Sequence, residues 1–420
     1  MTHTLPGPVN AHSHAFHRLL RGRTHAGPDG AAGDFWRWRE QMYHAAGSLT
    51  PQSMEQLATA VYAEMAVAGW TAVGEFHYLH HHADGAVRQD HAMERALARA
   101  ARAVGIRLVI LDTCYLQGGL GPDGTSLPLS AAQRRYADAD VASWASRWHG
   151  LNEALRQEDA GSQLVSLGAA IHSLRAVGRS HLVEFADWAA DHPEVPVHIH
   201  LSEQPAENTA VEAAYGMSPT SVLHAHGLLS PRLSAVHATH LREEDIALLG
   251  ATGTSVVMCP TTEADLGDGI GPAHALAQAG ARIALGSDQH AVLDPFLEMR
   301  ALEHGERLAT GQRGRFSPAQ LITAATDAGR HSLGLSHDPD LGPGLGPEAT
   351  AHFNDTVEVD AASVRTIGGR PDQLPMTATA ADVVAVKVAD TEIARAGHHT
   401  RLGDPAELYR ALFTDFPELR

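Results

Sequence analysis

The chain has 420 residues, of which 44% are hydrophobic and 19% charged, and its formal net charge is −18. This composition is that of an ordinary globular protein, and no apolar run approaches the roughly 18 residues that a membrane helix needs. The negative charge excludes non-specific nucleic-acid binding, because attraction to phosphates needs a basic surface. Two cysteines cannot form a disulfide framework, and residues 1–9 lack the pattern of a signal peptide. We expect a cytoplasmic protein with a small-molecule partner, no nucleic acid and no membrane contact.

Short β-type runs alternate with longer segments of helical periodicity along most of the chain. The predicted strands are Pro8–His12, Trp70–Phe76, Ile106–Thr113, Leu164–Ile171, Val195–His200, Ser234–Ala238, Thr254–Cys259 and Ala281–Gly286. The clearest predicted helices are Thr50–Ala68, Gln89–Val104, Leu174–Asp191 and Pro295–Ala309. This alternation is typical of βα units around a parallel sheet. It predicts an α/β fold, a TIM-like (β/α)8 barrel, over residues 1–345.

Two regions depart from the alternation. Residues 118–161 start rich in Gly, Pro and Asp and continue with two tryptophans, which predicts an inserted loop and a long helix placed to cover the pocket. After a linker at 342–346, β-type segments predict a small β-rich domain over 346–404. These segments are 353–359, 383–388 and 391–396. A terminal helix is expected within 405–420.

Residues able to bind a metal follow three of the predicted strands. His12 and His14 stand two positions apart, so that both can face one side of a strand. His200 and Asp288 follow two other strands. Catalytic groups of such barrels come from the C-terminal ends of the strands, and a zinc-bound water has its pKa lowered to about 7. The sequence therefore predicts a metal site formed by these four residues.

The lysine content bears on the number of metal ions. Lys387 is the only lysine, and it lies far along the chain from the candidate ligands. In the branch of metal-dependent barrel enzymes that uses two metal ions, a carbamylated lysine commonly bridges the two ions. We therefore expect one ion, Zn²⁺, although Fe²⁺ or Mn²⁺ accepts a similar ligand set.

Eight segments carry a resemblance to a known family, and together they span most of the predicted barrel. They are Asn10–Phe16, Phe35–Glu40, Gly74–Tyr78, Ile171–Val177, His198–Gln204, Val236–His240, Thr262–Gly269 and Gly286–Asp288. On these residues the chain resembles the amidohydrolase superfamily. The FWRWRE, EFHY and IHSLRAV stretches are similar to those of the formimidoylglutamate deiminases. Enzymes of that group hydrolyse N-formimidoyl-L-glutamate to N-formyl-L-glutamate and ammonia in histidine degradation.

The resemblance implies roles for individual residues. As zinc ligands it implies His12, His14, His200 and Asp288. As catalytic residues it implies Asp288, accepting a proton from the attacking water, His237, orienting or polarising the nucleophile, and Glu203, relaying protons to the substrate nitrogen. As binding residues for a dicarboxylate it implies Arg39 and Arg175, whose planar forks match carboxylates, with Tyr78 and His172. His240 is an alternative to His237, and Arg37 to Arg39.

Two departures from the family pattern stand out. His17 occupies a position where the family usually has a substrate-contacting glutamine, which predicts a changed preference or affinity. Family members also place a few tens of β-type residues before the HxH pair, so we expect the small β-rich domain to be reduced at its N-terminal side. The resemblance further implies a homodimer.

Two other functions stay open at this stage. One is a mononuclear-metal deaminase of a purine or pyrimidine such as guanine, cytosine or adenosine, and the other is a catalytically impaired metal-binding homologue. Among the remaining conspicuous residues, His80–His82 is predicted to form a polar loop, and Cys114 and Cys259 to be buried as small hydrophobic residues. Glu263 is expected to shape the loop after the seventh strand.

Overall fold

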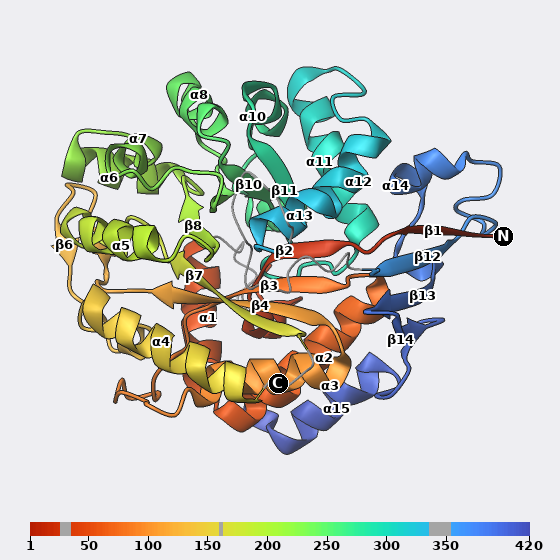
Figure 1. The fold of residues 1–420 in the computed structure, drawn as a ribbon, viewed down its shortest axis with the longest axis horizontal. Helices are drawn as coiled ribbons and strands as arrows, with labels where there is room; N and C mark the ends of the chain where they lie inside the picture. The colour runs from red at the N-terminus through yellow and green to blue at the C-terminus, as the bar shows by residue number, and fades with distance from the viewer. Residues whose placement is uncertain (26–34, 159–162, 336–353) are drawn as a thin grey trace.

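The structure is a computed structural model that describes residues 1–25, 35–158, 163–335 and 354–420 (Figure 1). Its centre is an eight-stranded parallel sheet in the order β2-β3-β4-β7-β8-β9-β10-β11. The strands are β2 (Val9–Ser13), β3 (Ala72–His77), β4 (Arg107–Cys114), β7 (Val165–Ile171), β8 (Val197–Leu201), β9 (Leu233–His237), β10 (Ser255–Met258) and β11 (Arg282–Leu285). A bridge between Ser13 and Asp288 joins the two ends of the sheet. The predicted barrel is confirmed, and each strand lies within two residues of its expected bounds.

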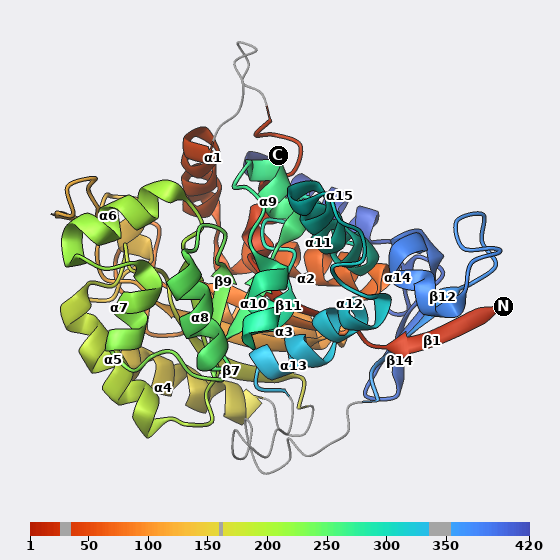
Figure 2. The ribbon, with the colours of Figure 1, turned by 90° about the horizontal axis from the view of Figure 1, so that it is seen from above.

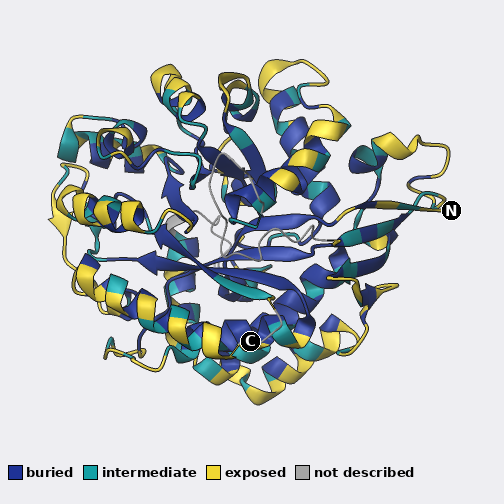
Figure 3. Cartoon of the chain, in the orientation of Figure 1, coloured by how far each residue is buried: buried dark blue, intermediate teal, exposed yellow. Residues whose placement is uncertain are grey.

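Helices surround the barrel, and the strands lie buried inside them (Figures 2 and 3). In chain order they are η1 (Ala15–Leu20), α1 (Phe35–Ser48), α2 (Pro51–Ala68), α3 (Ala92–Val104), η2 (Gln133–Arg135), α4 (Val141–Glu158), α5 (Arg179–Asp191), α6 (Pro205–Tyr215), α7 (Pro219–Ala225), α8 (Glu243–Ala251), α9 (Pro260–Leu266), α10 (Ala273–Ala279), α11 (Pro295–Thr310), α12 (Pro318–Ala325) and α13 (Asp327–Ser332). Because helices cover the sheet, its strands are largely buried on both faces. In the described part of the chain, no helix has the length and apolar character required to cross a bilayer.

Helix α2 shows how local sequence sets these boundaries. The Thr50 side chain accepts a hydrogen bond from the Ser53 backbone N–H, and Pro51 occupies the first turn. The helix ends at Gly69, whose φ of 112° is in the left-handed region that glycine adopts without strain. Leu57 and Val61 are fully buried on the face that packs inward. The helix is therefore defined by its caps and held by its apolar face.

A five-stranded antiparallel sheet lies beside the barrel, in the order β1-β12-β13-β14-β15. Its strands are β1 (Thr2–Pro6), β12 (Thr356–Asp360), β13 (Val383–Val388), β14 (Thr391–Arg395) and β15 (His398–His399). The three predicted strands are present, and β1 joins them by pairing with β12 from Thr2 opposite Asp360 to Pro6 opposite Thr356. Figure 1 shows this red first strand beside the blue ones. The appendage predicted from the sequence is thus completed by residues from the start of the chain.

Short helices and the terminal helix complete the appendage. They are η4 (Pro371–Gln373), α14 (Leu374–Thr377), η5 (Ala380–Asp382), α15 (Pro405–Asp415) and η6 (Pro417–Leu419). Helix α15 packs on α2, where the Tyr409 hydroxyl donates a 2.6 Å hydrogen bond to Glu64. The predicted linker at 342–346 lies outside the described residues. The division of the chain near residue 345 stays a prediction.

The insertion between β4 and β7 contains a small hairpin and the long helix α4. The hairpin strands are β5 (Gly119–Leu120) and β6 (Ser126–Leu127). At its tip, Gly124 has a φ of 81°, and a Cβ there would lie 2.3 Å from the backbone nitrogen of Ala214 on α6. Glycine therefore lets the hairpin rest directly on that helix.

Candidate active site

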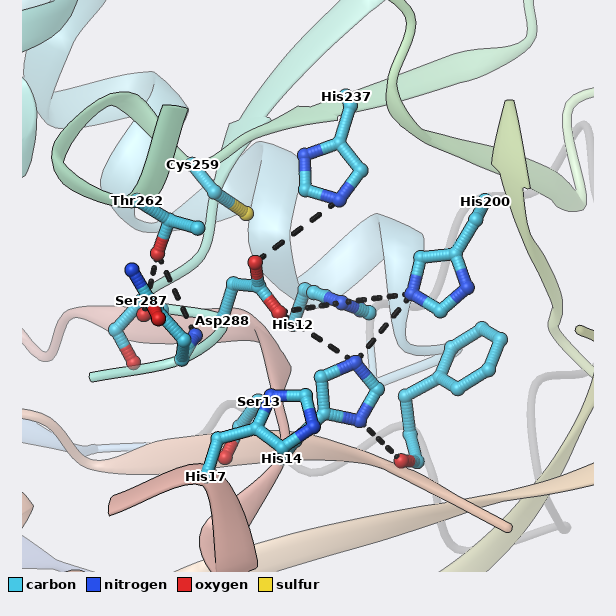
Figure 4. Close-up of polar contacts among 12 residues, drawn as sticks. His12, Ser13, His14, His17, His200, His237, Cys259, Thr262, Ser287 and Asp288 are labelled. Carbon is cyan, nitrogen blue, oxygen red and sulfur yellow. Dashed lines mark hydrogen bonds and ion pairs between the residues drawn. The ribbon is translucent and has the colours of Figure 1, made fainter. Parts of the chain in front are cut away.

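Four side chains converge at the C-terminal end of the barrel (Figure 4). The Nε2 atom of His200 lies 3.3 Å from that of His12 and 3.4 Å from that of His14. The Asp288 Oδ1 atom lies 3.4 Å from both His12 Nε2 and His14 Nε2. Ligands about 2.0–2.1 Å from a tetrahedral zinc ion are separated from one another by about 3.3–3.4 Å. These four separations match those between ligands of one such ion.

Backbone carbonyls orient two of these imidazoles. His14 Nδ1 lies 2.7 Å from the Phe76 carbonyl oxygen, and His200 Nδ1 lies 2.9 Å from that of His172. Each contact places the proton on Nδ1 and leaves the Nε2 lone pair directed at the site, as is common for metal-binding histidines. Burial lowers the pKa of His14 to about 3 and that of His12 and His200 well below the usual value. All three are therefore neutral near neutral pH, the form that binds metals.

The loops that carry the polar groups are conformationally strained. His237 and Asp288, which follow or end their strands, have φ values of 68° and 41°, and Ser202 after β8 has 51°. Residues other than glycine rarely adopt this left-handed region, at a cost of about 1–3 kcal/mol each. Such positions concentrate at functional sites, where surrounding contacts hold them in place.

Carboxylates surround His237. Its Nδ1 lies 3.4 Å from Glu263 Oε1, and its Nε2 lies 3.8 Å from Glu203 Oε1 and 4.0 Å from Asp288 Oδ2. Burial alone would lower the pKa of His237, but these carboxylates, Glu203 foremost, raise it to about 10. The alternative, His240, instead contacts the backbone oxygen of Asp268 at 2.8 Å. The structure thus brings His237 and Glu203 together beside Asp288 and adds Glu263.

The predicted binding residues line one cavity with this cluster. Its described walls include all five of them, namely His17, Arg39, Tyr78, His172 and Arg175. His17 Nε2 lies 3.1 Å from the Tyr78 hydroxyl, and Arg39 Nε donates a 2.9 Å hydrogen bond to the Tyr43 hydroxyl. Arg37, the alternative to Arg39, is not among the described lining residues.

Several lining residues were not identified from the sequence. They are Trp38, Met42, Tyr43, Tyr115 and Tyr136. Met42 and Tyr43 stand three and four residues after Arg39 on α1, which was a usable signal, since residues three and four apart share a helix face. Tyr115 directly follows β4 and Tyr136 lies in the insertion, and neither has a local pattern that marks it. The cavity is therefore more aromatic than the sequence suggested.

The His80–His82 run differs from its prediction. It lies in a loop, but His80 and His81 are buried. His80 Nδ1 lies 2.8 Å from Glu94 Oε1, and its Nε2 lies 3.0 Å from the Thr113 carbonyl oxygen. The polar side chains are buried because carboxylates on neighbouring elements meet them there. Cys114 and Cys259 are free and buried, as expected.

Comparison with known proteins agrees with this arrangement. The amidohydrolase family model matches residues 4–339. The chain belongs to the amidohydrolase family and is a hydrolase. It is 39% identical to formimidoylglutamate deiminase of Pseudomonas aeruginosa over 315 residues, which are 74% of this chain and 66% of that protein. It is 29% identical to 5-methylthioadenosine/S-adenosylhomocysteine deaminase of Syntrophobacter fumaroxidans over 362 residues, 85% of this chain and 72% of that one.

Solved structures show the same fold. An amidohydrolase from Brucella melitensis superposes with a TM-score of 0.83 at 31% identity, over 99% of this chain and 89% of that one. An adenosine deaminase from Xanthomonas campestris with bound zinc gives a TM-score of 0.77 at 24% identity, over 100% and 86% of the two chains. The second likeness is one of fold alone.

Proposed function

We propose that this protein is a zinc-dependent deiminase that hydrolyses N-formimidoyl-L-glutamate to N-formyl-L-glutamate and ammonia in histidine degradation. The observation that carries the proposal is one cavity with a metal-ligand set at one end and two arginines, Arg39 and Arg175, in its wall. The similarity to formimidoylglutamate deiminase supports it. The partner is then a small dicarboxylate carrying an amidine.

His12, His14, His200 and Asp288 would hold a single ion. Zinc bound there supplies hydroxide at neutral pH by lowering the pKa of water, and Fe²⁺ or Mn²⁺ is an alternative. Lys387 lies on β13 of the appendage, with its Nζ 3.7 Å from Glu358 Oε1, so no lysine is placed to bridge a second ion. This placement supports a mononuclear site.

Proton transfer falls to Asp288, His237 and Glu203. The Asp288 Oδ2 atom, which faces His237 Nε2 at 4.0 Å, can accept the proton of the attacking water. Water oxygen bonds to the formimidoyl carbon and gives a tetrahedral centre bearing one oxygen and two nitrogens. The proton taken from water reaches the terminal nitrogen of the protonated amidine through Glu203, that C–N bond breaks, the remaining hydroxyl proton passes to Asp288 as the carbonyl forms, and ammonia leaves. A cationic His237 stabilises negative charge on the oxygen.

The opposite part of the cavity suits two carboxylates. Arg39 and Arg175 offer planar donor forks, and Tyr78, His172 and His17 offer further polar contacts. The His17 Nδ1 atom is buried and has no hydrogen-bond partner among the described residues. A substrate group can therefore engage it in place of the glutamine usual in the family.

A second function has one observation in its favour. The tyrosines and the tryptophan in the wall would stack on a flat ring, as a purine or pyrimidine deaminase requires. Relatives that act on adenosine derivatives share 27–29% identity with this chain. The paired arginines favour the flexible dicarboxylate instead.

Ammonia release separates these functions. Zinc-loaded protein is assayed with N-formimidoyl-L-glutamate, guanine, cytosine and adenosine, and its metal content is measured by elemental analysis. We expect release from N-formimidoyl-L-glutamate alone. Release from a nucleobase or nucleoside would establish the second function, and no release by folded, metal-bound protein would identify a catalytically impaired homologue. Sedimentation of the same sample tests the expected homodimer.

A further inference from the structure

Glu75 on β3 is a fully buried carboxylate that the proposed chemistry does not use. Its Oε2 accepts a 2.8 Å hydrogen bond from the Ser13 hydroxyl, and its Oε1 accepts a 2.6 Å hydrogen bond from the Ala15 backbone N–H. Ser13 and Ala15 stand on either side of His14. One carboxylate therefore brackets a candidate metal ligand from both sides.

The bracketed segment lacks regular strand pairing. The register of β2 against β3 shifts between Asn10 and Ser13, so the strand is irregular across His12. Such a bulge re-aims side chains but disrupts the hydrogen bonds that would fix them. The His14 backbone N–H is held from the far side by the Asp288 carbonyl oxygen at 3.1 Å. Glu75 supplies the corresponding support from the β3 side.

A line of buried polar side chains continues from Glu75 to the other end of the ligand set. Ser13 Oγ lies 3.3 Å from His290 Nε2, and His290 Nδ1 lies 2.9 Å from Ser287 Oγ. Asn10 Nδ2 donates a 2.7 Å hydrogen bond to the same Ser287 hydroxyl. Ser287 directly precedes Asp288, so this line connects the loops that carry His14 and Asp288.

The Glu75 carboxyl also has no cationic partner. Other buried carboxylates pair with arginine, as Asp355 does with Arg107 at 2.7 Å. Within the described residues, Glu75 forms no ion pair. Its hydrogen-bond partners are the Ser13 hydroxyl and the Ala15 backbone N–H, and the Tyr62 hydroxyl also interacts with it. Burial raises the pKa of Glu75 to about 8, so the carboxyl is connected to the ligand set by its hydrogen bonds and not by a charge.

We propose that Glu75 is a positioning residue that sets the metal affinity of the site by fixing the backbone on both sides of His14. This inference rests on the proposed metal site but not on the identity of the substrate. Hydrogen-bonded partners of metal ligands typically change affinity by about 10- to 100-fold when replaced.

The test measures the zinc dissociation constant of the metal-free protein by competition with a chromogenic chelator. Glu75→Gln keeps the shape but replaces one of the two acceptor oxygens with an amide nitrogen, which cannot accept a hydrogen bond from Ser13 or Ala15, so we expect zinc to bind at least ten-fold more weakly. With saturating zinc, KM for N-formimidoyl-L-glutamate should stay within two-fold of the parent value. Ser13→Ala removes one bond of the bracket and should weaken zinc less, which keeps the test usable if Glu75→Gln does not fold.

Glu298→Gln is a matched control. Glu298 on α11 is also fully buried, and it accepts a 3.1 Å hydrogen bond from the Thr261 backbone N–H and a 2.5 Å one from the Thr261 hydroxyl. This variant should lose stability while zinc affinity stays within two-fold. Unchanged zinc affinity in Glu75→Gln, or equal weakening in both variants, would overturn the inference. A parent protein that binds zinc but releases no ammonia would refute the proposed function and leave this inference standing.

Discussion

Two buried groups of histidine and carboxylate side chains lie on opposite faces of strand β3, and both are compact enough to hold a metal ion. The inner group is His12, His14 and His200, with Asp288 against two of these histidines, and the outer group is His77, His80 and Glu94. In the inner group the Nε2 atoms of all three histidines face one another, and no arginine or lysine pairs with them among the described residues.

The outer group differs in what surrounds its ligand atoms. Both nitrogens of His80 are occupied, by Glu94 and by a backbone carbonyl. Arg147 lies 3.8 Å from Glu94 and also pairs with Asp112 at 2.6 Å and Asp138 at 2.8 Å. A fixed cation there opposes a second one. Closeness of histidine and carboxylate atoms alone therefore does not identify a metal site. The available lone pairs on the ligand atoms and the local charge distinguish the inner group from the outer one.

Replacing Asp288 should break the inner group most severely. Asp288→Ala removes both a predicted ligand and the acceptor of the water proton, so we expect kcat/KM for N-formimidoyl-L-glutamate to fall by at least about 10³-fold. Zinc content should fall with it, while circular dichroism stays unchanged. Activity within ten-fold of the parent would contradict the assignment of the inner group.

Replacing Arg147 should damage the outer group without affecting metal. Arg147→Met leaves the carboxylates of Asp112 and Asp138 buried without their cation, which should lower the free energy of unfolding by about 3–5 kcal/mol. Urea titration measures this change, and zinc per folded molecule should stay constant. Loss of zinc with unaltered unfolding would reverse the roles of the two groups.

Arg175 provides a further test of the comparison, because among the described residues it lacks a carboxylate partner as close as those of Arg147. Its Nε lies 3.9 Å from Glu207 Oε1, further than either carboxylate paired with Arg147. Arg175→Met should raise KM for N-formimidoyl-L-glutamate by about 10- to 100-fold, since a hydrogen bond to a charged group contributes about 1.5–3 kcal/mol. Zinc content should not change, and a parallel loss of zinc would remove its recognition role.

A pH-dependent effect concerns acid stability in the outer group. Burial lowers the pKa of His77 from 6.5 to about 3, although Glu94 opposes the shift. The unfolded chain takes up this proton near pH 6.5 while the fold does not, so stability falls as pH drops from about 6.5 to about 3, by about 1.4 kcal/mol per unit. His77→Gln should reduce the slope of unfolding free energy against pH over this range by about 1.4 kcal/mol per pH unit, which is the contribution of one proton. An unchanged slope would show that His77 does not carry it.

Much of this arrangement was accessible from the sequence. The strands were located because parallel strands buried on both faces form short apolar runs between helical segments. The residues at their ends, such as His200 and Asp288, were placed together by the rule that catalytic groups of a barrel gather at one rim. Neither step requires knowledge of contacts between distant segments.

Other features depend on such contacts and were missed. β1 pairs with β12 across more than three hundred residues, and a five-residue run gives no indication of its partner. Glu75 occupies a buried strand position at which an isolated sequence gives no reason for a carboxylate. The burial of His80 depends on Glu94 and on Arg147 from the inserted helix, so it could not be read from its own neighbourhood.

The left-handed backbone at His237 and Asp288 has a consequence for engineering. Under the proposed function, both residues stay in an unfavourable conformation because the chemistry requires their side chains, and each then lowers the heat resistance of the protein. A library screened only for survival at high temperature would enrich glycine or asparagine at these two positions. Thermostabilised descendants would then be more stable than their parent but catalytically inactive, unless activity is also part of the screen.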